Sequence, residues 1–555
     1  MARMTSSRFI AETIKGYGVS HVFFVPAILT RALAEMEDMD IRRVMTHSEI
    51  SAAYMADGYA RASRRPGVCL AQAVGAANLA AGLRDAFLAC SPVIAITGGP
   101  HPDSRYRYLY QQIEDFSMFA PVTKFKARVD KMERLPDLLR QAFRVAATGT
   151  PGPVHLEVPG RLGEGIEGEG DFQVIVEEEF SRYPAFRVEP SLESIRKAAH
   201  LLMEAERPVI VAGGGVIASD AAAELVDLAE KLAIPVATSL NAKSVIPDNH
   251  PLSLGVMGTY GRWCANLMVA EADLVFFVGT RAGGHITDNW RAPRPGTTVI
   301  QLDIEPTEIG RNYPAKVGLL GDASTTLRRL IETVEPSGPR EAWLQRAREL
   351  VGAWREKMAP LMNSNAVPIR PERICKEIAE FLPADAMLVA DTGHAAIWSG
   401  TMVGLNRPGQ QYIRCAGTLG WGFPGAIGVK CALPDRPVLC FTGDGGMYYY
   451  LSELETAARL GISVVVVVNN NGSLNQTKKG FDAAYGGTQR GRAREMWVFR
   501  ETDFALAAKS MGCFGIRVEH PGDIRPALEK AFAADRPALI DIVSDIEAVP
   551  PGPWG

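Results

Sequence analysis

The sequence predicts an α/β protein of three doubly wound domains, each built on a parallel sheet. The first observation is length, because 555 residues are too many for one hydrophobic core and suggest about three domains. The second is alternation, because short apolar segments typical of strands alternate with helical segments along the chain. In domains of this class, ligands bind beyond the carboxyl ends of the strands.

The strand-like segments group into three blocks. Residues 1–163 contain HVFFV, RRVMTH, GVCLAQA, PVIAITG and GPVHLEVP, and a linker rich in Gly, Glu and Pro is expected at 164–189. Residues 190–335 contain RPVIVAGGG, IPVATSL, ADLVFFVG and TTVIQLD, and a charged helical linker is expected at 336–367. Residues 368–555 contain AMLVADTG, QQYIRC, PVLCFTGDGG, SVVVVVNNNG and PALIDIVS.

Composition and length are those of a cytoplasmic protein the size of an enzyme. The net charge of −4 gives no electrostatic reason to bind nucleic acid or an anionic membrane. No apolar run is long enough for a membrane span, and the first residues resemble an amphipathic helix more than a secretory signal. The eight cysteines are scattered without a CxxC pair, so we expect them reduced and buried in a cytoplasmic protein.

The segment from Phe441 to Ser473 carries the strongest functional signal. PVLCFTGDGG is predicted to be a buried strand that ends at Asp444, with Gly443 before this residue and Gly445 and Gly446 after it. Glycines at a strand-to-helix turn let the backbone approach a phosphate, whose negative charge the helix N-terminus favours. The helical run MYYYLSELETAARLG follows, and ISVVVVV returns as a strand that ends in three asparagines. Carboxylate, amide and carbonyl oxygens at one sheet edge suit Mg²⁺. The alternative is an ordinary turn with a capping Asp and a polar loop.

This arrangement resembles the diphosphate-binding motif of thiamine-diphosphate-dependent enzymes, and the whole chain is similar to the large catalytic subunit of acetolactate synthase. The resemblance implies thiamine diphosphate and Mg²⁺ as cofactors, with metal ligands from Asp444, Asn471 and the carbonyl of Ser473. Which two of the three asparagines form the family's pair is open, and NNGSL favours Asn470-Asn471. It also implies that the first domain binds the pyrimidine ring and the third the diphosphate.

Glu49 is the expected catalytic carboxylate. THSEISAAYMADGYARA resembles the family segment in which HE precedes A(D/E)GYAR, although here Ser48 precedes the acid and His47 is displaced by one. The resemblance implies that Glu49 bonds the aminopyrimidine ring and so promotes removal of the thiazolium C2 proton. The alternative is a helix N-terminal acid stabilised by the macrodipole.

Further segments resemble the family in the same order along the chain. They place Gln111 at the active-site glutamine, Gly75, Gly393 and His394 near the cofactor, and Leu419 as the apolar wedge under it. A leucine at that position could equally belong to the core. In this family, the two halves of one site come from different subunits, which implies a homodimer at least, or a homotetramer.

The middle domain leaves the question of flavin open. RPVIVAGGGV is not the dinucleotide fingerprint, and by itself it is weak evidence for a nucleotide. Acetolactate synthases hold FAD here, and the resemblance would place it at Gly213, Gly214, Gly215, Arg281 and Asp303. Simple 2-oxo-acid decarboxylases keep the domain without flavin.

The reaction is predicted in outline. Where the family has FDDR, this chain has AGGH, so His285 replaces the arginine that contacts the carboxylate of the second 2-oxo acid. A histidine can be neutral at pH 7, whereas an arginine binds a carboxylate with two bonds. We expect an acetolactate synthase-like carboligase that converts a 2-oxo acid such as pyruvate to an enamine, which adds to a second carbonyl. The alternatives are a decarboxylase, an aldehyde or diketone lyase and, less favoured, a flavin oxidoreductase.

Overall fold

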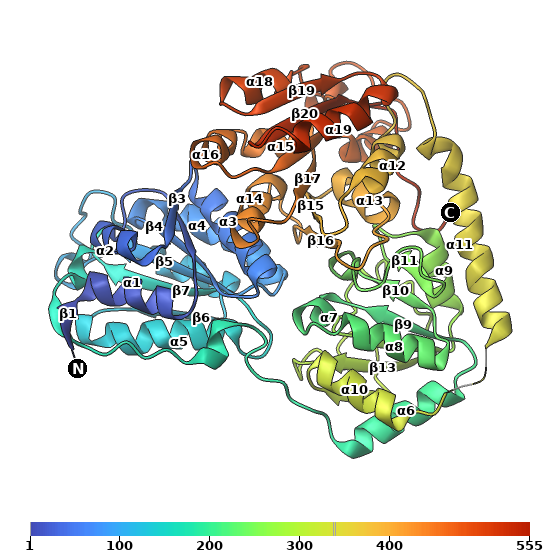
Figure 1. Cartoon of the computed structure of the whole chain (residues 1–555), viewed down its shortest axis with the longest axis horizontal. Helices are drawn as coiled ribbons and strands as arrows, with labels where there is room; N and C mark the ends of the chain where they lie inside the picture. Colours follow the sequence, from blue (N-terminus) through green and yellow to red (C-terminus); the bar gives the residue numbers. More distant parts are fainter. Residues whose placement is uncertain (1, 337, 339) are drawn as a thin grey trace.

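Three six-stranded parallel sheets, each covered by helices, make up the molecule (Figure 1). The computed structural model describes residues 2–336, 338 and 340–555. This confirms the predicted fold class. In Figure 1, the N-terminal domain lies at the left, the C-terminal domain at the top and the middle domain at the lower right. No helix within the described residues is long and apolar enough to cross a membrane.

The N-terminal sheet has the strand order β3-β2-β4-β5-β7-β6. Its strands are β2 (His21–Phe24), β3 (Arg42–Met45), β4 (Gly67–Ala71), β5 (Val93–Gly99), β6 (Phe125–Arg128) and β7 (Val154–Pro159). Its helices are α1 (Ser6–Gly16), α2 (Thr30–Glu35), α3 (Glu49–Ser63), α4 (Ala76–Leu88) and α5 (Leu135–Ala147).

The middle sheet has the order β11-β10-β9-β12-β13-β14. Its strands are β9 (Pro208–Ala212), β10 (Val236–Thr238), β11 (Ser253–Val256), β12 (Leu274–Val278), β13 (Thr298–Asp303) and β14 (Val317–Leu320). Its helices are α6 (Leu192–Glu204), α7 (Gly214–Ala218), α8 (Ala222–Leu232), α9 (Trp263–Glu271) and α10 (Ala323–Thr333).

The C-terminal sheet has the order β16-β15-β17-β18-β20-β19. Its strands are β15 (Met387–Ala390), β16 (Gln411–Arg414), β17 (Val438–Gly443), β18 (Val465–Asn470), β19 (Phe514–Val518) and β20 (Ala538–Val543). Its helices are α12 (Pro371–Phe381), α13 (His394–Met402), α14 (Gly422–Ala432), α15 (Asp444–Tyr449), α16 (Glu453–Leu460), α17 (Lys478–Ala484), α18 (Phe504–Ser510) and α19 (Ile524–Phe532).

Both segments expected as linkers contain regular structure. In residues 164–189, β8 (Glu169–Phe172) pairs antiparallel with β1 (Ala2–Thr5), so this stretch is attached to the N-terminal domain. In residues 336–367, α11 (Glu341–Met362) runs along the right edge of Figure 1 and buries Trp343 and Trp354. The aromatic side chains on one face of α11 explain why it packs against the middle and C-terminal domains.

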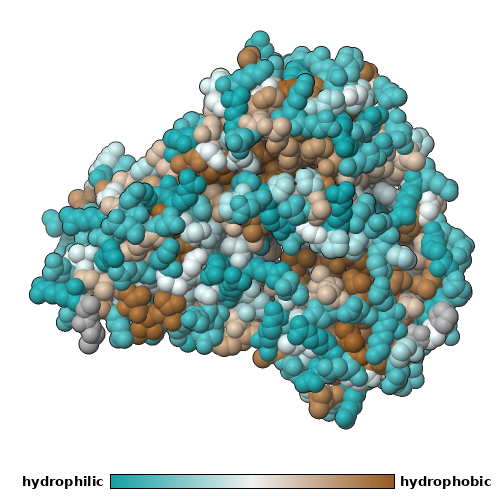
Figure 2. Space-filling view, in the orientation of Figure 1, coloured by the Kyte–Doolittle hydropathy of each residue, from teal (hydrophilic) through white to brown (hydrophobic). Residues whose placement is uncertain are grey.

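The helical run after Asp444 is divided, whereas the sequence suggests one helix. α15 ends at Tyr449 and α16 starts at Glu453, so the chain bends between them. Gly461 ends α16 in a left-handed conformation, as expected for a helix C-terminus. Figure 2 shows a mostly hydrophilic face with hydrophobic residues gathered in patches, one of them over the lower part of the C-terminal domain.

Candidate active site

The predicted metal ligands meet at the carboxyl ends of β17 and β18. Asp444 directly follows Gly443, the last residue of β17, and begins α15. Its Oδ2 accepts a hydrogen bond from the backbone N–H of Ser473 at 2.8 Å, and its Oδ1 accepts one from Gly445 at 2.8 Å. The Oδ1 of Asn471 accepts from the same Ser473 N–H at 3.1 Å. The carboxylate and the amide oxygen therefore lie beside one another.

The electrostatics of Asp444 are those of an acid lacking a cationic partner. The residue is 3% exposed, and burial raises the pKa of its carboxyl to about 7, against the backbone hydrogen bonds that lower it. A divalent cation would stabilise the ionised form. The described residues contain no cluster of three or more His, Cys, Asp or Glu side chains that could bind a metal, so a site here depends on amide and carbonyl oxygens as well.

The three consecutive asparagines have different surroundings. Asn470 turns towards β20, where its amide donates to Asp541 at 2.8 Å and to the carbonyl of Thr502 at 3.0 Å. Asn469 is buried, and its side-chain oxygen has no hydrogen-bond partner. Asn471 alone of the three is bonded to the Ser473 that also contacts Asp444. Asn470 therefore supports the loop, whereas the side-chain oxygen of Asn471 lies beside Asp444.

Asp391, which the sequence analysis did not select, ties the surrounding turns together. It follows β15 and accepts hydrogen bonds from the backbone N–H groups of Thr392, Gly420 and Gly422. Gly446 lies so close to it that a Cβ there would contact the carboxylate. Burial raises the pKa of Asp391 to about 6. The signal in the sequence was an acid at the end of the buried strand LVAD, the same signal as Asp444.

Three other predicted residues surround the same strand ends. Gly393 has a φ of 66° and precedes α13, and the side-chain oxygen of Gln476 fills the place that a Cβ would occupy. His394 is the first residue of α13, and burial lowers its pKa to about 4, so the ring is neutral. Leu419 is only half-buried, so its side chain is not enclosed in the core.

Glu49 begins α3 in the N-terminal domain. Ser48 caps this helix, because its hydroxyl accepts from the N–H of Ile50, which explains a serine where the family has histidine. The amide of Asn78 donates to Glu49 at 3.1 Å. Gly75 lies against the same carboxylate, and any Cβ at that position would overlap it. A side chain larger than hydrogen at residue 75 would therefore displace Glu49.

His47, displaced by one residue in the motif, joins two domains. Its backbone N–H donates to the buried Glu453 at 3.0 Å, and its ring Nε2 lies 2.8 Å from a carboxylate oxygen of Glu455. Both acids belong to the first turn of α16 in the C-terminal domain. The turn before Glu49 is therefore held by the C-terminal domain of the same chain.

Gln111 is linked through Arg161 to the turn beside Glu49. Its side-chain oxygen accepts from Arg161 at 3.3 Å, and the carbonyl of Arg161 accepts from the N–H of Ala73, in the turn that ends beside Glu49. Among the described contacts, no hydrogen bond or ion pair joins Glu49 to Asp444, Asn471 or Ser473. Within the described residues, the candidate half-site around Glu49 and the candidate half-site around Asp444 therefore do not bond directly to each other.

His285 reaches the C-terminal half-site through an aromatic contact. Its ring lies 4.7 Å from that of Tyr260 in an edge-to-face arrangement. The hydroxyl of Tyr260 accepts from Gln476, the residue beside Gly393, at 2.7 Å. Burial, aided by the charge of Arg414, lowers the pKa of His285 to about 4, so the imidazole is neutral.

Comparison with known families decides the assignment. Residues 4–118, 195–330 and 391–542 match, in order, the N-terminal TPP binding domain, the central domain and the C-terminal TPP binding domain of the thiamine pyrophosphate enzymes. The chain belongs to this family. It is a thiamine-diphosphate-dependent enzyme of the acetolactate synthase-like, carboligase type.

The similar thiamine pyrophosphate enzymes span nearly the whole chain. A "Probable acetolactate synthase large subunit" of Methanocaldococcus jannaschii is 34% identical over 99% of this chain and 94% of its own length. The "Acetolactate synthase isozyme 1 large subunit" of Escherichia coli is 31% identical over 99% of this chain and 96% of its own. The "Acetolactate synthase large subunit" of Haemophilus influenzae is 29% identical, with coverages of 98% and 95%.

In this thiamine pyrophosphate enzyme, the glycines expected at a flavin have a packing role of their own. Gly213 and Gly215 lie at the turn from β9 to α7, where a Cβ on either would clash with the backbone of Gly279. Gly214 between them has only Asn241 near the Cβ position, at 3.4 Å. Gly213 and Gly215 are therefore explained by two turns in contact and do not by themselves require a nucleotide, whereas this contact does not account for Gly214.

The polar residues expected at a flavin also have protein partners. Arg281 lies 3.6 Å from Glu308, and it donates to the sulfur of Cys90 from the N-terminal domain at 3.0 Å. Burial raises the pKa of Asp303 to about 6. Arg281 remains partly exposed, with 43% of its side chain accessible, so a ligand could still reach it.

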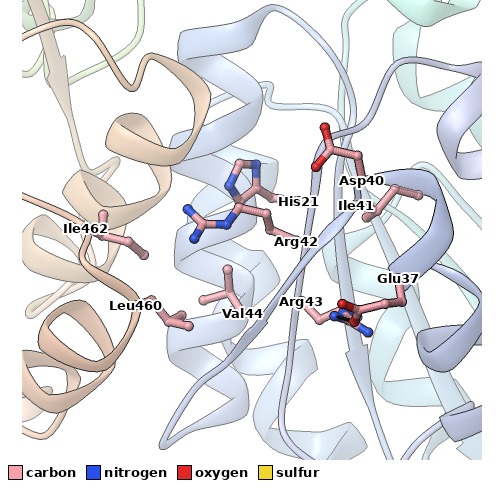
Figure 3. Close-up of a pocket in the computed structure, with 9 residues that line it drawn as sticks. All are labelled: His21, Glu37, Asp40, Ile41, Arg42, Arg43, Val44, Leu460 and Ile462. Atoms are coloured by element: carbon pink, nitrogen blue, oxygen red, sulfur yellow. Dashed lines mark hydrogen bonds and ion pairs between the residues drawn. The ribbon is translucent and has the colours of Figure 1, made fainter.

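A separate cavity of about 330 Å³ lies between the N-terminal and C-terminal domains (Figure 3). Its lining residues are His21, Glu37, Asp40, Ile41, Arg42, Arg43, Val44, Leu460 and Ile462. His21 and Arg42 begin β2 and β3, so the cavity lies at the amino ends of these strands. Ligands of parallel sheets bind at the carboxyl ends, and none of the predicted site residues lines this cavity.

Proposed function

We propose that this enzyme is a thiamine-diphosphate- and Mg²⁺-dependent carboligase whose donor is a 2-oxo acid such as pyruvate. The convergence of Asp444, Asn471 and Ser473 at two adjacent strand ends carries this proposal. The names of the similar proteins, all acetolactate synthase large subunits, support the same reaction. The alternatives within the family are a decarboxylase and an aldehyde or diketone lyase.

The residues present fit a magnesium diphosphate. Asp444 is a buried carboxylate without a cation, and the oxygen of Asn471 lies beside it, so both can become metal ligands. We assign the third protein ligand to the carbonyl of Ser473. The N–H of Gly445 is bonded to Asp444, and we assign the next N–H groups at the start of α15 to the phosphate oxygens.

Glu49 is assigned the catalytic role in the N-terminal half. Bound thiamine diphosphate supplies a carbon nucleophile, and Glu49 would hydrogen-bond its aminopyrimidine ring and so promote loss of the C2 proton. Asn78 and Gly75 orient the carboxylate of Glu49. We place Gln111 near the reacting carbon, and His285, neutral in its buried position, beside the second carbonyl compound.

We further propose a homodimer in which each site combines Glu49 of one subunit with Asp444 of the other. The absence of a bond between the two half-sites within one chain supports this. The loop that carries Gln111 also exposes Tyr106, Tyr108 and Tyr110, which are 82%, 100% and 76% accessible, as expected for a surface that a second copy covers. The similar proteins are named large subunits, so we propose that this chain also has a smaller partner subunit.

For the middle domain, we propose FAD bound in a structural role, with a flavin-free domain as the alternative. The open space beside Gly214 and the accessible part of Arg281 support a bound FAD. The packing of Gly213 and Gly215 on Gly279 supports a flavin-free domain. Purified protein that shows the yellow absorbance of flavin would decide for FAD. A colourless preparation that takes up no added FAD would decide against it.

The reaction is tested directly with the purified protein, thiamine diphosphate, Mg²⁺ and pyruvate, with all products followed by proton NMR. Acetolactate is the expected product. Acetaldehyde alone would move the enzyme to the decarboxylases. If pyruvate stays unchanged while the cofactor binds, the donor is another carbonyl compound, and diketones, hydroxyketones and aldehydes are tested next.

A further inference from the structure

Three positively charged side chains are buried in the described part of the chain, and one of them lacks an acid. Lys243, Arg262 and Arg414 are 3%, 5% and 6% exposed. Lys243 and Arg262 both contact Asp248 at 2.9 Å, so each has an acidic partner, although they share it. Arg414 takes part in no ion pair among the described residues. Buried charges are normally paired, because an isolated one is costly.

The guanidinium of Arg414 also has unused hydrogen-bond donors. Its Nε donates to the carbonyl of Cys415, and this is the one bond that the side chain makes to the described residues. An arginine has five N–H donors, so the terminal nitrogens are left without protein partners. These nitrogens are not among the fully buried unpaired polar atoms, so they keep some contact with solvent. The side chain is thus held at its base and open at its tip.

The position of Arg414 is at the candidate active site. It is the last residue of β16, at the carboxyl edge of the C-terminal sheet, and it lies five residues before Leu419. Its charge is close enough to His285 to contribute to the lowered pKa of that ring. The middle domain and the cofactor-binding domain therefore meet at this guanidinium.

The backbone around Arg414 is held firmly. Its carbonyl accepts from Arg61 at 2.5 Å. The next residues, Ala416, Gly417 and Thr418, all donate their N–H groups to the buried Asp85. Because α3 and α4 fix the carbonyl of Arg414 and the residues that follow it, the base of the side chain needs little further ordering when a ligand binds.

We propose that Arg414 binds the carboxylate of the substrate, and so supplies from β16 the positive charge that His285 lacks. This inference rests on the proposed function and narrows it. The substrate is a carbonyl compound with an adjacent carboxylate, because a planar guanidinium forms two parallel hydrogen bonds with that group. Neutral aldehydes and diketones would leave the buried charge unpaired and bind less well.

Binding of an unreactive substrate analogue tests the inference without turnover. Oxamate has the carboxylate and the adjacent carbonyl of a 2-oxo acid, and oxamide has the same shape without the charge. Calorimetric titration of the full chain, loaded with thiamine diphosphate and Mg²⁺, should show binding of oxamate and no binding of oxamide. Arg414→Gln should weaken oxamate binding by about 100-fold, and Arg414→Lys should restore part of it.

The control is Arg407→Gln, which removes an exposed arginine from the same connection before β16 and should bind oxamate like the original protein. The Arg414→Gln protein should also keep its melting temperature, because it loses an unpaired buried charge and no ion pair. Equal oxamate binding by the Arg414→Gln and original proteins would overturn the inference. So would a loss of affinity for thiamine diphosphate alone, which would assign Arg414 to the diphosphate.

These measurements distinguish the role of Arg414 from the proposed carboligase reaction. If pyruvate is converted with an unchanged KM by the Arg414→Gln protein, the carboligase proposal stands and the role of Arg414 is wrong. If oxamate binding depends on Arg414 and pyruvate is not converted, Arg414 still binds a carboxylate and the donor is a different carboxylate-bearing compound.

Discussion

Glu49 and Asp444 both lie in the first turn of a helix, where the macrodipole stabilises any acid. Position alone therefore does not distinguish a functional acid from a structural one. Their neighbours do, because Asp444 is buried with backbone donors and no cation, whereas Glu49 is oriented by Asn78 and pressed against Gly75. Asp444 thus lacks a cation, and Glu49 is held in a fixed orientation by its neighbours.

Replacing Glu49 by Gln should leave the fold intact and reduce turnover by about 10²–10⁴-fold, because an amide cannot promote the proton transfer. Turnover of pyruvate and the melting temperature measure the two effects. Glu193→Gln is the matched control, since Glu193 also lies in the first turn of a helix but is exposed. Near-normal turnover of Glu49→Gln would refute the catalytic assignment.

Replacing Asp444 by Asn should abolish stabilisation by magnesium. With thiamine diphosphate present, Mg²⁺ should raise the melting temperature of the original protein by several degrees, because the ligand binds the folded state only. The Asp444→Asn protein should show no such rise. Asp435→Asn, at an exposed position, should respond like the original protein. A full magnesium response in Asp444→Asn would exclude this residue as a metal ligand.

The lowered pKa of His285 predicts a dependence of stability on pH. The ordinary value is 6.5 and the value in the folded protein is about 4, so protons favour the unfolded chain. The stabilising contribution of neutral His285 is complete above pH 6.5 and is lost as the pH falls towards 4. The melting temperature of the original protein, relative to His285→Asn, should therefore fall between pH 7.5 and pH 5. A difference in melting temperature between the original protein and His285→Asn that does not change with pH would contradict this prediction. The control is His520→Asn, which changes an exposed histidine.

At the scale of elements, α3 and α14 make the closest contact between the N-terminal and C-terminal domains. Gly58 of α3 lies directly against the backbone of Gly425, and Gly428 of α14 lies against Met55. Trp421, just before α14, donates to Asp57 of α3 at 2.9 Å. The two helices touch through their backbones, so neither glycine has room for a side chain.

Gly58→Ala should lower stability by about 1–3 kcal/mol, because the added methyl forces the two helices apart. Gly352→Ala is the opposite case, since Gly352 in α11 has open space around it and alanine favours the helix by about 0.5–1 kcal/mol. Thermal unfolding should therefore shift in opposite directions for the two substitutions. If Gly58→Ala raised the stability instead, α3 and α14 would have to move apart at little cost in free energy.

The strands that the sequence did not suggest are mostly at sheet edges. β6, β11, β14 and β19 all end a sheet, and none was expected. An edge strand is paired on one side only, so its sequence need not be uniformly apolar, as FKAR in β6 illustrates. Central strands such as β17 and β18 are buried on both faces, and their apolar runs were recognised at once. The helical run after Asp444 is also divided, and the first turn of its second part contacts His47 of the N-terminal domain, which local sequence does not reveal.

At the scale of the whole molecule, the exposed loop around Gln111 predicts the assembly. Tyr108→Asp should place a charge in the proposed subunit interface and shift the protein from dimer to monomer. Activity should fall with it, because each site needs both subunits. Sedimentation at several concentrations measures the assembly. Leu192→Asp changes a residue of the middle domain that is 62% exposed and should leave the dimer intact. A Tyr108→Asp dimer with full activity would contradict the shared site.

The sequence by itself determined the three parallel-sheet domains and the family, and it predicted Glu49 and Asp444 as site residues, because central strands and ligand turns are encoded by local runs of apolar residues and glycines. The partners of Asn470 and Asn471 became visible only in the tertiary structure, because Asn470 bonds Asp541 of β20, whereas Asn471 bonds Ser473, which also contacts Asp444. The tertiary structure also revealed Asp391, which bonds turns far apart in the chain. The proposed role of Arg414 also depended on the tertiary structure, because the lack of an acidic partner is significant only once the side chain is known to be buried.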